Sequence, residues 1–303
     1  MGWRTVFVSS AEKMSFSLNS IVLKRNEDEL KIPIEDIDTL VVDNPRTVIT
    51  PAVLNQLCDN HVNVLLCDEK HNPNVTFLPV SGYFRQFKKV EEQLSWSDGQ
   101  KDSLWKNIVT AKISNQQAVC AQVGQEAVCK TLCRLASEVQ TGDMTGREAL
   151  AARFYFPAVF GEGFMRGHDD LVNAALNYGY AIILSCFNRS LAAKGLLPYW
   201  GIHHKGEYNA FNLSCDLMEP FRPFVDSWVV KHADSFHEND LAFKGGLVSL
   251  LNAPVLLGGR REKMHNAIDL FCNYCIDFMA GSIEVMGANH FPAFPDGWWE
   301  NAI

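Results

Sequence analysis

The sequence lacks any long apolar run. None of its hydrophobic stretches approaches the roughly 20 consecutive apolar residues that a membrane-spanning helix needs. Residues 1–7 also lack the apolar core of a secretory signal, and the strand-like run after Met1-Gly2 does not favour an exposed acylated arm. These absences argue against a helical membrane protein. We expect a cytoplasmic protein with no membrane partner.

A second cysteine pair with zinc-ligand spacing is also missing. The nine cysteines are odd in number and irregularly spaced, and Cys272 and Cys275 form a lone pair of this kind. One such pair cannot complete a four-ligand zinc site. We therefore expect reduced, mostly buried thiols, with Cys272 and Cys275 on one face of a helix.

Positive charge is scarce. The chain has 27 Lys and Arg against 35 Asp and Glu, which gives a net charge of −8. Such a chain repels nucleic-acid phosphates at long range, so nucleic acid can bind only through a local basic patch, a bound metal ion or an oligomeric groove. Internal repeats and low-complexity segments are absent as well.

The residues that are present indicate an α+β protein in two parts. Short β-like runs separated by polar turns fill the first 80 residues, and apolar residues recur at helical spacing after residue 100. We predict a small β-sandwich-like domain over residues 1–83 with a dimerisation or assembly role, a linker over 84–100, and a larger all-α catalytic domain over 101–303. The predicted strands are 5–8, 15–18, 20–24, 29–33, 38–42 and 62–66. The acidic residues of this part are expected to be solvated: Asp36, Asp38, Asp68 and Glu69.

Helical periodicity is strongest in two segments of the second part. Leu104, Trp105, Ile108, Val109 and Ile113 form one apolar face, and residues 171–187 form a largely apolar helix that Asp169 or Asp170 would cap. On that second helix the residues Asn173 and Asn177 are one turn apart. We interpret this pair as a buried hydrogen-bonding seam.

Ligand chemistry is densest in residues 201–223. His203 and His204 are adjacent, and Asp216 and Glu219 are three residues apart, so a helix beginning here with Pro220 in its first turn would point both carboxylates the same way. Carboxylates and a neutral imidazole that converge suit a hard or borderline divalent ion. This pattern favours phosphate chemistry over a structural zinc site.

Glu148 has two interpretations from its neighbours alone. Residues 145–148 fit a capping box, in which Glu148 reaches back to the amide of Thr145 at the helix start. Alternatively, Glu148 heads a helix that borders a polyanion site together with Arg153. The local sequence favours capping.

Four blocks together resemble the CRISPR-associated integrase, the endonuclease-like subunit of the spacer-acquisition complex. They follow in the same order, and the block at 201–211 is similar to the branch found beside the single-protein RNA-guided effector nuclease. The β-then-helical plan also matches, so the resemblance covers essentially the whole chain. The blocks are residues 146–156, 171–180, 201–204 and 216–223.

The resemblance implies a catalytic ligand set for Mg²⁺ or Mn²⁺. The family's metal-binding glutamate falls on Glu148, its histidine on His204 and its second acidic ligand on Glu219, where many relatives have aspartate. Asp216 corresponds to a supporting acidic position. The family pattern selects His204 over His203, and it makes capping the secondary role of Glu148.

The resemblance further implies a prokaryotic source and DNA as the substrate. The 3′-OH of an incoming fragment would attack a phosphodiester of the CRISPR repeat, and water in its place would give endonuclease cleavage. Implied partners are double-stranded DNA, a second copy of the chain, a smaller adaptation subunit, the effector nuclease and an accessory DNA-end-binding subunit. Alternatives are a catalytically silent DNA-binding scaffold and an unrelated metal-dependent phosphodiesterase. Candidate phosphate contacts, each of which could instead be a solvated or carboxylate-paired charge, are Arg153, Arg166, Lys205 and Arg222.

Overall fold

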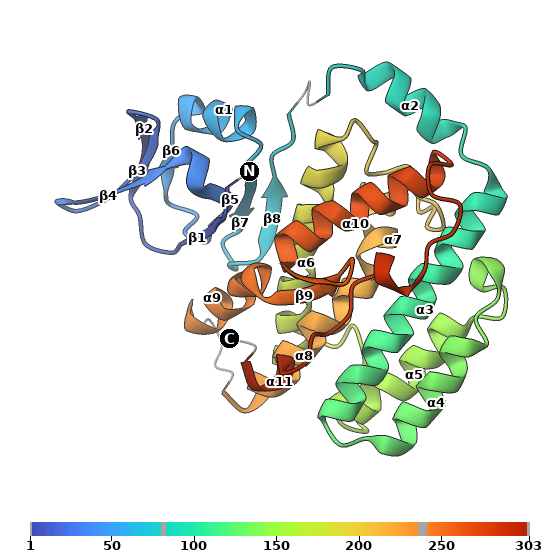
Figure 1. The fold of residues 1–303 in the computed structure, drawn as a ribbon. Helices are drawn as coiled ribbons and strands as arrows, with labels where there is room; N and C mark the ends of the chain where they lie inside the picture. The colour runs from blue at the N-terminus through green and yellow to red at the C-terminus, as the bar shows by residue number, and fades with distance from the viewer. Residues whose placement is uncertain (1, 80–82, 236–240, 302–303) are drawn as a thin grey trace.

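The strands of the first 80 residues gather at one end of the molecule, and most of the helices lie at the other. The computed structural model describes residues 2–79, 83–235 and 241–301 (Figure 1). The predicted order of a β-rich part followed by a mainly helical part is confirmed.

Two four-stranded sheets form the N-terminal part. The first has the order β1-β5-β7-β8, in which β1, β5 and β7 are parallel and β8 is antiparallel to β7. The second has the order β4-β3-β2-β6. The bounds of the strands are β1 Arg4–Val8, β2 Lys13–Ser17, β3 Ser20–Arg25, β4 Asp28–Pro33, β5 Ile37–Val42, β6 Val48–Ile49, β7 Asn63–Cys67 and β8 Pro73–Thr76.

Strand β5 is buried along its whole length, because it lies between two parallel neighbours and is covered on its faces. The short β6 and β8 were not predicted. Helix α1 (Pro51–Asp59) connects β6 to β7, with Thr50 before it and Pro51 in its first turn. The turn η1 (Ile34–Asp36) leads into β5.

The helical part is built around α6, which is buried on nearly all sides. It packs against α10 and α8, and also against β7 of the first sheet (Figure 1). Asp170 caps α6 through a 2.7 Å hydrogen bond from the Asn173 amide, as predicted. The α-helices are α2 Gln86–Leu94, α3 Asp98–Gln122, α4 Glu126–Ser137, α5 Arg147–Phe160, α6 Leu171–Ala193, α7 Asn212–Met218, α8 Arg222–His232, α9 Leu241–Ser249, α10 Met264–Met279 and α11 Trp298–Asn301. Short 3-10 turns are η2 Thr141–Asp143, η3 Glu219–Phe221, η4 Ala233–Ser235, η5 Leu250–Asn252 and η6 Ala288–His290.

The expected linker contains helix α2, which is attached to the helical part. Its fully buried Gln93 donates to the carbonyls of Leu197 and Trp200 at 3.0 and 3.1 Å and accepts from the Leu197 amide at 2.8 Å. Three hydrogen bonds from one buried side chain fix α2 against the segment that precedes His204.

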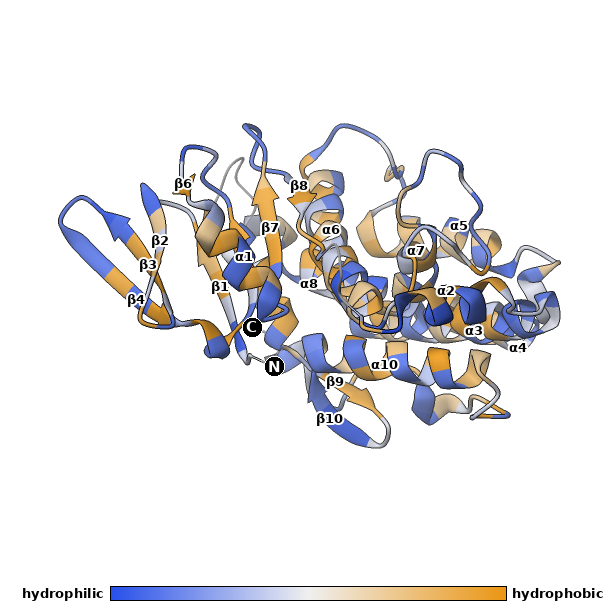
Figure 2. Ribbon diagram, turned by 90° about the horizontal axis from the view of Figure 1, so that it is seen from above, coloured by the Kyte–Doolittle hydropathy of each residue, from blue (hydrophilic) through white to orange (hydrophobic). Residues whose placement is uncertain are grey.

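One hairpin was not predicted in the helical part. Strands β9 (Pro254–Leu257) and β10 (Arg260–Lys263) pair around Gly258 and Gly259, whose φ angles of +63° and +72° suit the turn. In Figure 2 β9 is apolar and β10 polar, so the basic residues of β10 lie on the outer strand. Cys272 and Cys275 are both buried on α10, which confirms the helix-face interpretation.

Asp38 overturns one expectation. It is 2% exposed instead of solvated, because side chains from α6 and α10 pack against it. Its carboxylate is 3.3 Å from Arg189 Nη2 on α6 and 3.6 Å from His265 Nδ1 on α10. Burial alone would raise the pKa of Asp38, but the hydrogen bond from His265 and the charge of Arg189 lower it. We call Asp38, Arg189 and His265 the interdomain cluster.

Within the described ranges, none of the helices combines the length and the apolar character that crossing a membrane requires.

Candidate active site

Helix α5 presents Glu148 from its first turn. The residue before the helix, Gly146, has a φ of +62° and gives no side-chain cap. Asp143 caps α5 instead, since its carboxylate accepts from the amides of Arg147 at 2.8 Å and Glu148 at 3.0 Å. The capping box on Thr145 is therefore wrong, and the Glu148 carboxylate is directed to another helix.

A tight turn holds His204. Its backbone amide and those of Ile202 and His203 donate to the fully buried carboxylate of Asp216, at distances of 2.7 to 3.1 Å. A Cβ at Gly201 would lie 2.4 Å from the His204 carbonyl oxygen, so only glycine fits there. Asp216 thus organises the turn as well as the ring.

The His204 ring donates from Nδ1 to Asp216 Oδ1 at 2.5 Å. This hydrogen bond, together with the nearby charges of Asp216, Glu219 and Glu148, raises the pKa of His204 against the opposing effect of burial. Because Nδ1 faces Asp216, the Nε2 atom is the nitrogen left to act as a ligand. His203 instead stacks on Trp105, with ring centroids 4.1 Å apart and planes 5° apart.

The carboxylates of Asp216 and Glu219 form their hydrogen bonds and ion pairs with different residues. The helix expected to begin near Asp216 begins at Asn212, and three short helices follow one another: α7, η3 and α8. Pro220 and Pro223 stand in the first turns of η3 and α8, where a missing amide hydrogen is harmless. Asp216 points to the 201–204 turn, whereas Glu219 points to Lys112 and Arg222.

Lys112 of α3 joins the two glutamates. Its Nζ donates to Glu148 Oε1 at 2.6 Å and forms an ion pair with Glu219 Oε2 at 2.5 Å, the latter with angles outside those of a hydrogen bond. Arg222 Nε lies 3.0 Å from the other Glu219 oxygen. We call Lys112, Glu148, His204 and Glu219 the acidic centre.

Opposite charges outweigh burial in this centre. Burial would raise the pKa of Glu219, yet the charges of Lys112 and Arg222 lower it. Burial would likewise lower the pKa of Lys112, and the two glutamates raise it. Both glutamates therefore face a lysine that keeps its proton.

Two arginines lie over the ring of Tyr180. The guanidinium carbons of Arg222 and Arg166 lie 4.8 and 5.5 Å from its ring centroid. Arg166 is held by Asn173 and, at 2.8 Å, by Asn177. The predicted buried seam is thus half right, because Asn173 is buried but Asn177 is exposed, and both bind the arginine.

The two other predicted cations are less constrained. Arg153 is exposed on α5, and Lys205 is exposed directly after His204. Both are accessible to a ligand.

Asp226 lies behind the arginines and ties three helices together. Its carboxylate accepts from Tyr155 of α5 at 2.8 Å and from Tyr180 of α6. Burial raises the pKa of Asp226 to about 6, although both hydroxyl donors and the charge of Arg222 act in the other direction. Asp226 therefore carries a partial proton near neutral pH, deep in the protein.

Sequence reasoning missed Lys112, Asp143 and Trp105 as parts of this site. One signal was available for Lys112, since it stands one turn after Ile108 on the apolar face of α3. A charged residue on such a face needs a buried partner. Its partners lie on other helices, and Glu148 is 36 residues away.

The donor set suits a hard divalent ion, but the ligands are not spaced around one point. Among the described residues, no three His, Cys, Asp or Glu side chains are close enough to hold a metal ion as they stand. Glu148 and Glu219 do converge on a single cation, the Lys112 ammonium. Carboxylate oxygens and an imidazole are ligands that Mg²⁺ and Mn²⁺ accept.

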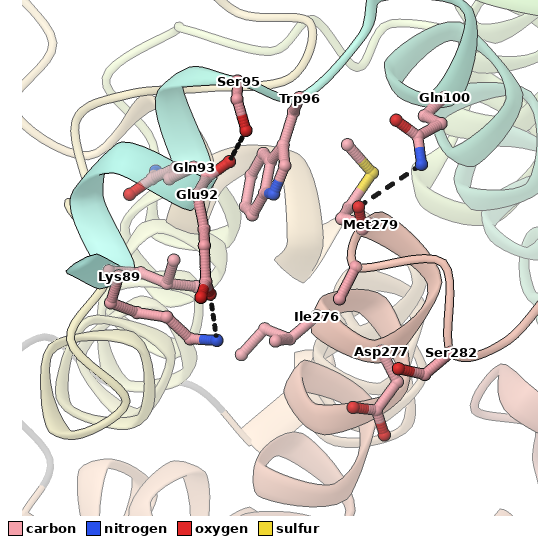
Figure 3. Close-up of a pocket in the computed structure, with 12 residues that line it drawn as sticks. Lys89, Glu92, Gln93, Ser95, Trp96, Gln100, Ile276, Asp277, Met279 and Ser282 are labelled. Atoms are coloured by element: carbon pink, nitrogen blue, oxygen red, sulfur yellow. Dashed lines mark hydrogen bonds and ion pairs between the residues drawn. The ribbon is translucent and has the colours of Figure 1, made fainter. Parts of the chain in front are cut away.

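A cavity of about 560 Å³ lies apart from this centre, between α2, the start of α3 and the end of α10 (Figure 3). Two of its charged residues, Lys89 and Glu92, neutralise each other at 2.8 Å, and Gln100 donates to the Met279 carbonyl. Neither glutamate of the acidic centre lines the cavity. It is therefore a separate feature of the surface.

The fold and the site together define a class: a two-part protein, β-sheets before helices, with an acidic, histidine-containing centre in the helical part. The chain belongs to the family described as CRISPR associated protein Cas1, whose sequence profile matches residues 6–247. The CRISPR-associated endonuclease Cas1 of Neisseria meningitidis is 40% identical over 230 residues, which is 76% of each chain. A Cas1 endonuclease of Pyrobaculum aerophilum is 26% identical over 235 residues, 72% of this chain and 78% of the relative.

Solved structures share the fold. A CAS1 protein from Thermotoga maritima superposes with a TM-score of 0.75 at 15% identity, over 94% of this chain and 99% of that one. A casposase bound to its integration product has a TM-score of 0.71 at 18% identity, over 94% and 92% of the two chains. At these identities the likeness supports the fold, and the family assignment depends on the sequence matches.

Proposed function

We propose that this protein is the integrase and endonuclease of CRISPR spacer acquisition, and that it inserts short DNA fragments into a repeat array with the help of a divalent metal ion. One observation carries the proposal. Glu148 and Glu219, which lie on different helices, converge on a single cation beside an imidazole that Asp216 holds by Nδ1. The family's endonuclease relatives, including the Neisseria protein, support the nuclease and integrase role.

The residues that would hold Mg²⁺ or Mn²⁺ are Glu148, Glu219 and His204, the last through Nε2. Asp216 orients the ring, as carboxylates commonly do for histidine ligands. The longer side chain of Glu219, compared with the aspartate of many relatives, still reaches the same cation as Glu148. When bound, the ion supplies a Lewis acid that polarises a phosphodiester and favours an ionised hydroxyl.

This chain supplies positioning and positive charge. Arg222 and Arg166 both lie over the Tyr180 ring, and Arg222 also contacts Glu219 of the acidic centre, so both are placed to contact phosphates of a strand bound there. Lys205 directly follows His204 in the sequence, and Arg153 stands on the same helix as Glu148. Both side chains are exposed. With a net charge of −8, DNA binding needs a local source of positive charge, and these residues offer one beside any bound metal ion.

The nucleophile comes from the DNA. The 3′-oxygen of the incoming fragment forms a new bond to a repeat phosphorus, while the bond from that phosphorus to the adjacent repeat oxygen breaks. One phosphodiester replaces another, so the step needs no external energy source and no nucleophilic side chain. Water in place of the 3′-OH gives hydrolysis.

The proposed partners follow from the family. One structural relative is part of a Cas6-RT-Cas1–Cas2 complex, and another is a casposase bound to its integration product. For this chain we propose double-stranded DNA, a second copy of the chain and a smaller adaptation subunit. The effector nuclease, an accessory end-binding subunit and the specific branch stay predictions.

A strand-transfer assay tests the proposal. The protein, with and without its smaller partner, is incubated with duplex DNA bearing free 3′-OH ends and a repeat-bearing plasmid, in Mn²⁺ or EDTA. We expect joined products in Mn²⁺ only, and loss of these products in Glu148→Ala. A matched control is Glu138→Ala, which removes an ion-paired glutamate outside the acidic centre. Unchanged joining by Glu148→Ala would contradict the site, and binding without any joining would favour the silent scaffold.

A further inference from the structure

Lys112 stands where the proposed metal ion would need to be. Its Nζ lies 2.6 Å from Glu148 Oε1 and 2.5 Å from Glu219 Oε2. Carboxylate oxygens bind divalent ions at roughly 2.0 to 2.6 Å, so an ion held by the same two oxygens would occupy nearly the same volume. An ammonium group and a divalent ion cannot share that volume, because they repel each other and collide.

Burial strengthens the interactions between the charges of this arrangement. The Lys112 side chain is 12% exposed and Glu219 is 5% exposed, so solvent screens their charges only weakly. Without a cation between them, Glu148 and Glu219 would face each other across a poorly solvated gap. Arg222 relieves only one of the two, since its contact is with Glu219.

We infer that Lys112 is a positioning residue that acts as an internal counter-cation, competing with the divalent ion for Glu148 and Glu219. It keeps the two carboxylates together in the metal-free protein and moves aside on its flexible four-carbon chain when the ion binds. The helix position of Lys112 supports this role. It follows Ile108 on the buried face of α3, where an unpaired charge would be costly.

This inference rests on the proposed metal dependence, and it makes a distinct prediction about affinity. Competition lowers the apparent affinity for the metal, so removing the lysine charge should tighten metal binding even though a polar contact is lost. An ordinary supporting lysine has the opposite effect, because its removal loosens the site and weakens binding.

The test is Mn²⁺ binding to the whole protein without DNA, measured by isothermal titration calorimetry and by the electron paramagnetic resonance signal of free Mn²⁺. We expect Lys112→Met to bind Mn²⁺ about tenfold more tightly than the wild type. Lys112→Arg keeps a cation between the carboxylates and should stay within about threefold of the wild type. Lys112→Gln, which retains a hydrogen-bond donor, should also bind more tightly and serves if Lys112→Met fails to fold.

The matched control is Lys194→Met. Lys194, which directly follows the last residue of α6, is similarly buried, with 17% of its side chain exposed. It pairs with Asp269 of α10. Its substitution should leave Mn²⁺ affinity unchanged. In the thermal unfolding of metal-free protein, Lys112→Met should lose stability that Mn²⁺ restores, whereas Mn²⁺ should not rescue Lys194→Met.

Two results separate failure of this inference from failure of the proposed function. If Glu148→Ala abolishes Mn²⁺ binding but Lys112→Met and Lys112→Gln bind no more tightly than the wild type, Lys112 is not a competitor. If neither the wild type nor any Lys112 variant shows Mn²⁺ binding that depends on Glu148, the metal site itself is wrong.

Discussion

Two clusters of the same residue chemistry have opposite surroundings in this protein. The interdomain cluster and the acidic centre each combine carboxylate, a basic side chain and histidine. In the first, Asp38, Arg189 and His265 all have side chains at most 7% exposed. In the second, the side chains of Glu148 and His204 are 27% and 43% exposed.

The ratio of charges differs as well. Asp38 has two basic partners, so the interdomain cluster needs nothing further to be neutralised. Lys112 has two acidic partners, and although Arg222 pairs with one of them, Glu219, the nearby Asp216 adds a third carboxylate against these two cations. A sealed cluster with enough positive charge joins two parts of a fold, whereas an accessible one with surplus negative charge can accept a cation. The difference lies in exposure and balance, not in residue type.

Removing the histidine of each cluster in turn should give the largest difference between the two clusters. His204→Ala should lower metal-dependent strand transfer by roughly 10³-fold, because a lost metal ligand removes several kcal/mol of transition-state stabilisation. Its stability should change little, since Asp216 keeps three backbone donors. His265→Ala should lower the melting temperature and keep the activity per folded molecule. Initial rates and thermal scans of both variants check this, and full activity in His204→Ala would remove it from the site.

Breaking the interdomain cluster should cost nearly as much, but in stability. Asp38→Ala leaves Arg189 buried without its carboxylate, which should reduce the free energy of unfolding by about 3–5 kcal/mol. The control is Asp36→Ala: its side chain is 27% exposed, and its 3.8 Å pair with Arg4 and its hydrogen bond from Trp3 are together expected to contribute only about 1 kcal/mol. Urea denaturation measures both. Equal losses would mean that burial does not distinguish the two aspartates.

Asp226 should make stability depend on pH. Its pKa is raised from 3.8 to about 6 in the folded protein, so between these values the native state holds a proton that the unfolded state has lost. The stability that protonation of Asp226 contributes is therefore fully present below about pH 4. It is lost as the pH rises through about 6, a decrease of roughly 3 kcal/mol in the free energy of unfolding. Asp226→Asn should lack this decline. The difference in melting temperature between the two proteins, followed from pH 4 to pH 7, measures it, and a constant difference would contradict the raised pKa.

The cap of α5 should give the smallest effect. Asp143→Ala removes the acceptor for the Arg147 and Glu148 amides and should reduce stability by about 1 kcal/mol. Asp143→Asn keeps an acceptor and tolerates the φ of +50° at this position, so it should remain closer to the wild type. Thermal unfolding of both variants tests this, and an equal loss in the two would show that the carboxylate charge matters more than the cap.

Much of the fold could be predicted from the sequence because its signals are local. Alternating and periodic apolar residues indicated β1 to β5, β7 and α6 within a few residues. Prediction failed where a neighbour in space decided the outcome. Asp38 was expected in solvent and is covered by helices far along the chain, and the cap of α5 comes from Asp143 rather than Thr145.

For the site, the residues Glu148, His204 and Glu219 were identified mainly through the family resemblance, since local spacing favoured a capping role for Glu148 and left His203 and His204 open. The structure separates the two histidines, with His203 on Trp105 and His204 on Asp216. Metal binding by the three residues stays a prediction.

The sequence by itself determined which segments form most of the strands and helices, that Cys272 and Cys275 share a buried helix face, and to which family the four blocks point, because each depends on residues close together in the chain. Only the tertiary structure decided that Lys112 joins Glu148 to Glu219 and that Asp38 is sealed between the two parts. Electrostatic interactions depend on distance in space and on access of water, and neither can be read from spacing along the chain.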